Sequence, residues 1–276
     1  MGITSSVISA LTPLCKPKHS ILDETNSIIQ CSPTLAIHTV SLSTTSHPQE
    51  FIHLQETYQK EGTLLVHLWE DVWLRHPEQV LSRVKSFLRL NKTYHARKTH
   101  LTAVDAAQAK QFFTTNHLQG FVKAKHHYGL TIEGDTIAMA SFSDLRPMKS
   151  KGTDYTSAEL VRFASKEGCT VTGGLSKLIK HFLTLKQPND LMSYADRDWS
   201  LGKGYEQLGF KLTALTDPAY LYVDSITKQR YFRHRLPKKV LYALDRQKEL
   251  NLDDYLAEQG FLKAFNTGNL KYHLYV

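Results

Sequence analysis

The distribution of apolar and polar residues along the chain predicts a mixture of strands and helices. Residues 64–69 form a near-continuous apolar run, which is typical of a strand buried on both faces. Pro77 then opens a segment in which apolar residues recur every three or four positions up to Leu88, as on one face of a helix. We therefore expect a small α/β unit that ends near residue 90, followed by a linker over residues 91–98.

From residue 100 onward, the pattern predicts strands and helices in the order β-α-β-β-β-α-β-α-β-β. Asp105 is a suitable N-cap for the first of these helices, and Glu133–Asp135 has the composition of a hairpin turn. The expected elements are a strand from residue 100, a helix over 105–115, strands over 128–132, 136–142 and 159–164, a helix over 175–186, a strand over 191–195, a short helix around 202–208, strands over 210–215 and 220–223, a helix near 252–259, and a closing hairpin of 261–265 with 270–275.

Composition and charge narrow the class of protein. Hydrophobic residues make up 41% of the chain and charged residues 22%, so it can bury a core, which excludes collagen-like and wholly disordered classes. The formal net charge of +8 favours a polyanionic partner such as nucleic acid. Three cysteines without a C-x-x-C pair fit a reducing cytoplasm. We find no apolar run near the roughly 20 residues of a membrane helix and no histidine spacing typical of a metal site, so neither a membrane nor a metal is expected.

The segment with the clearest chemical character is a strand followed by two glycines and a helix. Gly173 and Gly174 would let the backbone approach a ligand, and the first amides of the next helix can bind an anion. Ser176 and Lys177 would add a hydroxyl group and a positive charge. A plain turn that needs glycine for its geometry explains this segment equally well when it is taken alone.

A second segment, which lies downstream, favours a ligand-binding function over a plain turn. Asp196 follows a predicted strand, and Tyr205 stands in a short helix that ends in Leu208-Gly209-Phe210. Together with the diglycine segment, this order resembles the C-terminal half of the GNAT acyltransferase fold. The resemblance implies that the glycine turn holds the pyrophosphate of acetyl-CoA or a related acyl-CoA, and that Tyr205 protonates the departing thiolate. The turn departs from the common Q/R-x-x-G-x-G/A pattern, which leaves the donor open. The implied cofactor contacts are Phe163, Thr172, Gly173, Gly174, Leu175 and Lys177.

A narrower resemblance rests on five blocks in one order, at residues 116–120, 162–163, 173–178, 193–196 and 205–206. Together they resemble phage and prophage DNA-modifying proteins of the Mom type, over roughly residues 100–225. This resemblance implies transfer of a small acyl-derived group to the N6 amine of adenine in double-stranded DNA, which would protect phage DNA from restriction in the host cytoplasm. The positions that it implies for the active site are Arg162, Ser176, Asp196 and Tyr205.

The types of these four residues suit the implied chemistry. An aspartate can accept or orient a proton of the amine, and a tyrosine can act as an acid. An arginine can hold a phosphate or carboxylate by paired hydrogen bonds, and Ser176 can bind the donor. The alternatives are a surface pair of Arg162 with Glu159, a solvated Asp196 and a half-buried core Tyr205. Each alternative is the more frequent one for a lone residue, but the ordered spacing favours function.

Candidate contacts to DNA lie in three places. Residues 116–120 border the target-base pocket in the Mom-type family, although a polar run that ends in glycine is also a common helix C-cap. Residues 226–239 carry six cations and no acid, which suits phosphate binding, although a solvated basic face is the alternative. An aromatic surface that includes Phe142 could receive a base flipped out of the duplex. The residues expected to contact DNA are Asn116, His117, Gln119, Tyr194, Arg197, Trp199, Arg230, Arg233 and Arg235.

Residues 62–88 resemble the last strand and helix of Vsr-like endonuclease domains. A working nuclease of that class holds a metal with carboxylates and a nearby lysine, and we find no E-x-K or D-x-K arrangement upstream. We therefore expect a degenerate nuclease fold kept for DNA binding or packing. In that case Glu70 and Asp71 are structural or capping residues.

The sequence as a whole predicts an α+β enzyme, with a GNAT-like mixed sheet and flanking helices behind a small α/β nuclease-like region. The expected parts are residues 1–95, a catalytic domain over 96–225, and a basic extension over 226–276. Two other functions stay open. One is a nuclease-derived DNA-binding protein or homing-type endonuclease without transferase activity, and the other is a transferase that acts on protein or small-molecule amines.

Overall fold

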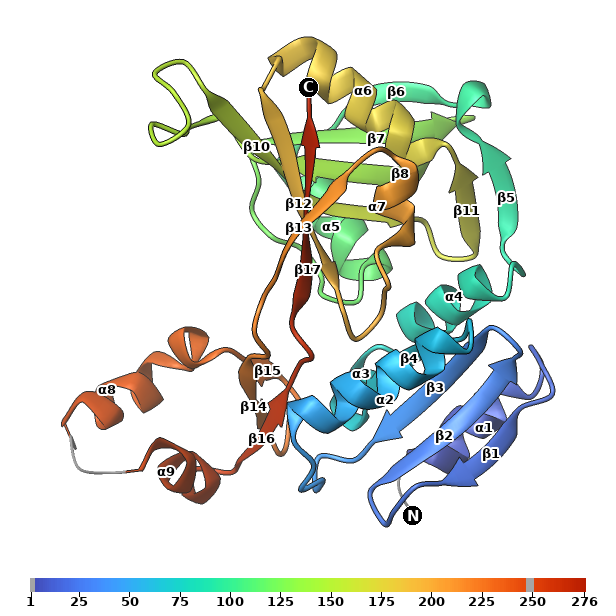
Figure 1. The fold of residues 1–276 in the computed structure, drawn as a ribbon, viewed down its shortest axis with the longest axis vertical. Coiled ribbons are helices and arrows are strands. Elements are labelled where there is room, and N and C mark those ends of the chain that lie inside the picture. The colour runs from blue at the N-terminus through green and yellow to red at the C-terminus, as the bar shows by residue number, and fades with distance from the viewer. Residues whose placement is uncertain (1–2, 247–250) are drawn as a thin grey trace. The chain divides into compact units, whose positions relative to one another are not determined.

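The computed structural model describes residues 3–246 and 251–276 and divides the chain into two compact units (Figure 1). The first unit consists of Met1–Pro77, Asp196–Ser200 and Thr216–Asn269, and the second of Glu78–Ala195, Leu201–Leu215 and Leu270–Val276. The chain therefore crosses between the units several times. The expected boundaries after residues 95 and 225 do not coincide with this division, because residues 216–269 return to the first unit.

The first unit is built on two sheets. Its elements are α1 (Thr4–Leu11), β1 (Lys18–Ile21), β2 (Asn26–Ser32), β3 (Leu35–Val40), α2 (Pro48–Lys60), β4 (Leu64–Trp69), α3 (Glu70–Arg75), β14 (Tyr220–Asp224), β15 (Arg230–Tyr231), the 3₁₀ helix η2 (Arg233–Arg235), α8 (Lys238–Arg246), α9 (Leu252–Glu258) and β16 (Phe261–Phe265). The larger sheet has the order β1-β2-β3-β4, and the smaller one the order β15-β14-β16.

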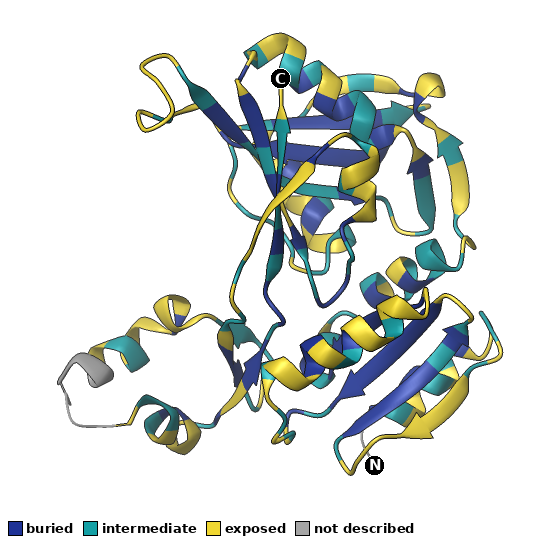
Figure 2. Ribbon diagram, viewed as in Figure 1, coloured by how far each residue is buried: buried dark blue, intermediate teal, exposed yellow. Residues whose placement is uncertain are grey.

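Burial explains the order of the larger sheet. β3 and β4 pair in parallel and are connected by α2, and their residues are almost all buried, as expected for apolar runs covered on both faces. β1 lies at the edge and is exposed along its whole length (Figure 2). An aromatic cluster joins the two sheets, because Phe51 of α2 and Trp69 of β4 pack against Phe265 of β16.

The second unit is built on one large mixed sheet. Its elements are α4 (Pro77–Phe87), β5 (Lys92–His95), the 3₁₀ helix η1 (Ala96–Lys98), β6 (His100–Ala103), α5 (Ala106–Asn116), β7 (His126–Ile132), β8 (Asp135–Phe142), β9 (Arg146–Pro147), β10 (Thr156–Ser165), β11 (Cys169–Thr172), α6 (Gly174–Lys186), β12 (Asp190–Asp196), α7 (Lys203–Gln207), β13 (Lys211–Leu215) and β17 (Asn269–Tyr275). The sheet has the order β13-β17-β12-β10-β8-β7-β6, with β9 paired to β10, while β5 and β11 form a separate parallel pair.

Helices pack on both faces of this sheet. Leu178 and Phe182 of α6 are fully buried against one face, where Phe182 stacks on Phe142 of β8 with ring centroids 4.2 Å apart. Ala109 and Phe113 of α5 are buried against Met139 on the other face. The expected α+β class, a mixed sheet with flanking helices, is confirmed.

The strands β10 and β12 pair in parallel and then diverge. Their register runs from Ser157 opposite Asp190 to Leu160 opposite Ser193. Beyond this point β10 continues along β8 with a register shift between Leu160 and Arg162. The two strands therefore separate toward their C-terminal ends.

The closing hairpin predicted for residues 261–265 and 270–275 was wrong. β16 pairs with β14, and β17 pairs with β13, with Lys211 opposite His273. The reason is burial, because Leu270 and Tyr272 belong to the core of the large sheet. The predicted strands 210–215 and 220–223 exist, but they likewise belong to different sheets.

Candidate active site

Two hydroxyl groups meet where β10 and β12 diverge. The Ser193 hydroxyl lies 3.0 Å from the carbonyl oxygen of Leu160 and 3.0 Å from the Tyr205 hydroxyl. Ser193 is the donor in both contacts, so its single proton is shared between the carbonyl oxygen of Leu160 and the phenol oxygen of Tyr205. The arrangement brings the phenol of α7 to the last paired residues of the two strands.

The ring of Tyr205 is fixed by aromatic neighbours. It stacks on Tyr272 and meets the edge of Phe210, each at 5.3 Å between ring centroids. Gly202, the N-cap of α7, has a φ of 76°, and a Cβ there would collide with the Tyr272 side chain. Burial raises the pKa of Tyr205 above its ordinary value, which outweighs the opposing effects of the Ser193 hydrogen bond and nearby positive charges. The phenol therefore keeps its proton at neutral pH.

Those positive charges come from two arginines. Arg162 of β10 donates from Nε to the carbonyl oxygen of Gly120 at 3.3 Å and from Nη1 to that of Val161 at 3.0 Å. Burial, followed by the charges of Arg162 and Arg83, lowers the pKa of His117 to about 3. Since both arginines also act on the pKa of Tyr205, they add positive potential around two neutral rings.

Sequence reasoning missed Arg83. It lies on α4 among the residues that the helical periodicity placed on the polar face, where it was one of several similar cations. No local signal distinguishes it. The alternative partner considered for Arg162, Glu159, has its carboxylate 3.6 Å from the Arg146 guanidinium.

Both glycines that precede α6 have a geometric reason. Gly173 is the N-cap and has a φ of 74°, while a Cβ on Gly174 would press against Val171 at 3.0 Å. Along the chain, β11 lies between β10 and this turn, and it pairs with β5. The sequence predicted neither of these two strands. The glycines therefore serve the local geometry, and the first amides of α6 are left without a side-chain cap.

The structure gives Lys177 another role than cofactor binding. Its ammonium group donates to the carbonyl oxygens of Ala96 and Thr99 at 2.9 and 2.6 Å and contacts the Thr99 hydroxyl at 3.2 Å. An ammonium group has three donors, and these contacts use all of them. Thr172 is exposed, Ser176 is half-buried, and Leu175 and Phe163 pack against the core of the sheet.

Asn116 also has a structural role. Its amide donates to the carbonyl oxygen of Phe112 at 2.8 Å and accepts from the backbone nitrogen of Glu167 at 2.7 Å. His117 accepts from the backbone nitrogen of Gln119 at 3.1 Å. These contacts match the helix C-cap that was considered as the alternative for this run.

Several residues expected to face DNA are buried or paired. Phe142 is fully buried and Trp199 is only 8% exposed, so neither can receive a base, whereas Tyr194 is 39% exposed. Arg230 forms a two-pronged ion pair with Asp71, with Nη2 2.8 Å from Oδ1. Phe142 and Trp199 are therefore buried, whereas the Arg230 side chain stays 23% exposed and is paired with the buried carboxylate of Asp71.

Of the remaining basic candidates, Arg197 pairs with Glu56 at 3.0 Å. Arg233 and Arg235 lie exposed in η2, where Phe232 and His234 stack with ring centroids 5.8 Å apart. Exposed cations beside exposed rings are the arrangement expected of a nucleic-acid contact.

Asp196 belongs to the first unit, although it ends β12. Its carboxylate accepts from the backbone nitrogen of Asp198 at 3.0 Å. Asp198 is buried and accepts from the backbone and hydroxyl of Thr267 at 2.9 and 2.6 Å. Burial and the charge of Asp196 raise the pKa of Asp198 to about 7.

Glu70 has the contacts expected of a structural residue. Its carboxylate accepts from the backbone of Leu42 at 3.0 Å and from the Ser41 hydroxyl at 3.2 Å. Across residues 3–246 and 251–276, no group of three or more histidine, cysteine, aspartate or glutamate side chains is placed to hold a metal ion. Within the same ranges, none of the helices has the length and apolar character needed to cross a bilayer.

No protein-family model matches the sequence, and no characterised protein matches it significantly. Solved structures with similar folds include a Bacillus subtilis acetyltransferase in complex with CoA, at 10% identity and a TM-score of 0.36, which covers 65% of this chain and 99% of that one. A GNAT family acetyltransferase from Elizabethkingia anophelis with acetyl-CoA bound has 13% identity, a TM-score of 0.35 and the same coverage. An IAA acetyltransferase from Bacillus cereus has 11% identity and a TM-score of 0.36, and covers 64% of this chain and 99% of that one. These TM-scores are low, so we infer the function from the geometry of the chain's own residues.

Proposed function

We propose that the second unit is an acyl-CoA-dependent transferase that works at the divergence of β10 and β12. The observation that carries this proposal is the position of the Tyr205 hydroxyl, 3.0 Å from Ser193 at the last paired residues of the two strands. A phenol that keeps its proton at neutral pH, held at the opening of a sheet, has a proton to give to a leaving group.

The residues around the opening fit an acyl-CoA. Beyond Leu160 the register between β10 and β12 ends, so an extended ligand arm can lie along the separated backbone as an added strand would. The uncapped amides of α6 and the charges of Arg83 and Arg162 favour phosphate groups. When bound, such a cofactor supplies an activated thioester carbonyl.

The proton balance of the reaction is simple. The acceptor amine forms a bond to the carbonyl carbon, the carbon–sulfur bond breaks, and Tyr205 gives its phenolic proton to the departing sulfur. The proton that the amine loses returns to the phenolate of Tyr205. The Ser193 hydroxyl donates toward the phenol oxygen and so holds it in position.

We propose adenine N6 in double-stranded DNA as the acceptor, with protection of phage DNA from restriction in the host cytoplasm as the biological result. Two observations support a DNA acceptor, namely the net charge of +8 and the exposed Arg233 and Arg235 beside stacked rings. The choice of adenine rests on the resemblance of the five sequence blocks to Mom-type proteins. Asp196 stays a sequence-based candidate for orienting the acceptor amine.

The test uses the full chain in two assays. Release of free CoA from acetyl-CoA in the presence of duplex DNA, of lysine peptides or of small amines tests acyl transfer and the acceptor class. Mass spectrometry of nucleosides from the DNA of an expressing host tests the adenine product. We expect thiol release with duplex DNA and a modified adenine nucleoside.

Each other outcome has a clear meaning. Release only with peptides or small amines would replace the DNA acceptor while keeping the transferase. No release with any acceptor from folded protein would reject the transferase. Magnesium-dependent cleavage of plasmid DNA would support the nuclease alternative instead.

A further inference from the structure

A cavity of the second unit lies over the paired part of β10, β12, β17 and β13. Its volume is about 530 Å³, and its lining includes Glu159, Met192, Lys271, His273 and Tyr275. Their strand neighbours Leu160, Leu191 and Tyr272 are buried in the core of the sheet. Because side chains alternate along a strand, the cavity lies on the other face of the sheet from this core. Its volume is within the range of small-molecule sites.

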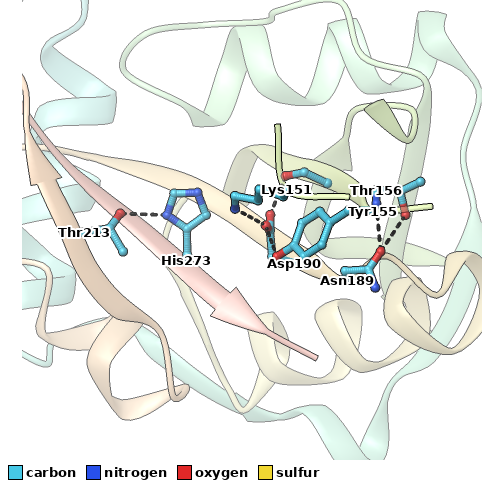
Figure 3. Close-up of polar contacts among 8 residues, drawn as sticks. Lys151, Tyr155, Thr156, Asn189, Asp190, Thr213 and His273 are labelled. Carbon is cyan, nitrogen blue, oxygen red and sulfur yellow. Dashed lines mark hydrogen bonds and ion pairs between the residues drawn. The ribbon is translucent and has the colours of Figure 1, made fainter. Parts of the chain in front are cut away.

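One wall of the cavity is held in place by a buried carboxylate. Asp190 is fully buried and accepts from Lys151 at 2.9 Å, from the Tyr155 hydroxyl at 2.7 Å and from the Ser157 hydroxyl (Figure 3). Burial alone would raise the pKa of Asp190, but these hydrogen bonds lower it below its ordinary value. The carboxylate therefore stays charged and fixes Lys151, which lines the cavity.

The cavity carries more positive than negative charge. Arg146, Lys151 and Lys271 line it, and Glu159 is the acid among the lining residues. Glu159 lies 3.6 Å from Arg146, and Lys151 is paired with Asp190, so Lys271 provides the net positive charge. A surface of this charge favours an anionic ligand.

A neutral histidine adds a hydrogen-bond acceptor. His273 Nδ1 lies 2.7 Å from the Thr213 hydroxyl (Figure 3). The same hydroxyl lies 3.3 Å from the carbonyl oxygen of Lys271. Nδ1 is thus engaged by Thr213, so Nε2 is the ring nitrogen that can serve a ligand. Burial, with a contribution from Lys271 and Lys151, lowers the pKa of His273 and keeps the ring neutral at pH 7.

The cavity also offers flat and apolar surface. The rings of His273 and Tyr275 stack with an interplanar angle of 14°. Met148 and Met192 line the cavity as well, and methionine adapts to flat, polarisable groups. Inorganic phosphate alone would leave this surface and most of the volume unused.

We propose that this cavity binds a nucleotide, with the phosphate group on Lys271 and Arg146 and the base against the methionines and the stacked rings. The shared chemistry is a nucleoside phosphate, which can be a free nucleotide or one residue of a nucleic-acid strand. The site is distinct from the opening at Tyr205 and does not depend on acyl transfer, so the two proposals can fail separately.

The test is calorimetric titration of the full-length protein at low salt with adenosine monophosphate, adenosine, inorganic phosphate and a short single-stranded oligonucleotide. We expect adenosine monophosphate to bind more tightly than adenosine or phosphate alone. Lys271→Gln should weaken its binding about tenfold, which is the range for a hydrogen-bonded charge. Lys180→Gln removes an exposed lysine from α6 and should leave binding unchanged.

A second variant covers the case in which Lys271→Gln perturbs the sheet. Ala214 lines the cavity on the exposed edge strand β13, so Ala214→Trp should fill the space with little cost to folding and abolish binding. If the oligonucleotide binds more tightly than adenosine monophosphate, the ligand of the cavity is part of a nucleic-acid strand. If the two bind equally, the ligand is a free nucleotide. Unchanged binding in both cavity variants, or no binding of any probe, would overturn the proposal.

Discussion

Two clusters of charged groups, one in each unit, differ in what surrounds them. In the first unit the buried Asp71 pairs with the opposite charge of Arg230, and the buried Asp198 accepts two hydrogen bonds from Thr267. In the second unit two like charges, Arg83 and Arg162, act together on neutral rings. A buried carboxylate that loses its partner destabilises a fold, so the first cluster is structural, whereas positive potential around a neutral phenol suits the binding of an anionic ligand. This difference marks the cluster of the first unit as structural and the cluster of the second unit as a candidate for chemistry.

Breaking the ion pair of the first unit should give the largest effect. Arg230→Met leaves the buried Asp71 carboxylate without its guanidinium, and we expect a loss of about 3–5 kcal/mol in the free energy of unfolding. Denaturant unfolding followed by tryptophan fluorescence measures it, because Arg230 lies over the ring of Trp69. The double variant Asp71→Leu with Arg230→Met should recover much of the loss. An unchanged single variant would show that the pair is not structural.

Removing the phenol hydroxyl of the second unit should act on activity instead. Tyr205→Phe keeps the stacked ring and deletes the proton donor, so we expect thiol release from acetyl-CoA to fall at least about 100-fold. The free energy of unfolding should change by roughly 1 kcal/mol, the value of one hydrogen bond. Tyr242→Phe is the matched control, because that tyrosine is 66% exposed in α8. Equal losses in both variants would remove Tyr205 from the reaction.

The pH dependence of stability tests the first unit further. The pKa of Asp198 is about 7 in the folded chain, against an ordinary value of 3.8, so the folded state holds the proton more tightly. The stability that this group contributes is present below pH 4 and is lost as the pH rises toward 7. Asp198→Asn keeps an oxygen for Thr267 and removes the titration.

We therefore expect Asp198→Asn to be more stable than the parent chain at pH 8, on the order of 1–2 kcal/mol, and nearly equal at pH 4. The stability that His38 contributes depends on pH in the opposite direction. Burial lowers the pKa of His38 to about 4, so this stability is lost as the pH falls from 6.5. Unfolding curves of both chains between pH 4 and 8 separate the two effects. A constant difference across this range would contradict the raised pKa of Asp198.

Sequence reasoning succeeded where structure is set by neighbours along the chain. Periodicity located the buried strand at 64–69 and the helix at 175–186, and the composition of Glu133–Asp135 located the hairpin of β7 and β8. It failed for β17, whose partner β13 lies more than fifty residues earlier in the chain. Gly268 suggested a hairpin turn, but the structure needs it because a Cβ would collide with the carbonyl oxygen of Thr216.

In the candidate site, too, sequence reasoning succeeded only for residues that lie close together along the chain. The resemblance to the GNAT fold placed Tyr205 and the strand of Ser193 in one site, and only twelve residues separate the two along the chain. It gave no reason to select Arg83 among the cations of its helix. It also counted Arg230 with a basic surface, because a buried partner such as Asp71, 159 residues away, leaves no mark on local composition.

The smallest effect is expected from the exposed cations of η2. If the chain binds duplex DNA, the double variant Arg233→Gln with Arg235→Gln should reduce the slope of log affinity against log salt by about 2, because each lost phosphate contact removes about 0.9. Lys110→Gln with Lys180→Gln removes the same charge from exposed positions of α5 and α6 and should leave the slope nearly unchanged. Fluorescence anisotropy with a labelled duplex at several salt concentrations measures both. Equal slopes in the two double variants would mean that net charge alone draws the protein to DNA, and that η2 is an ordinary solvated face rather than a contact.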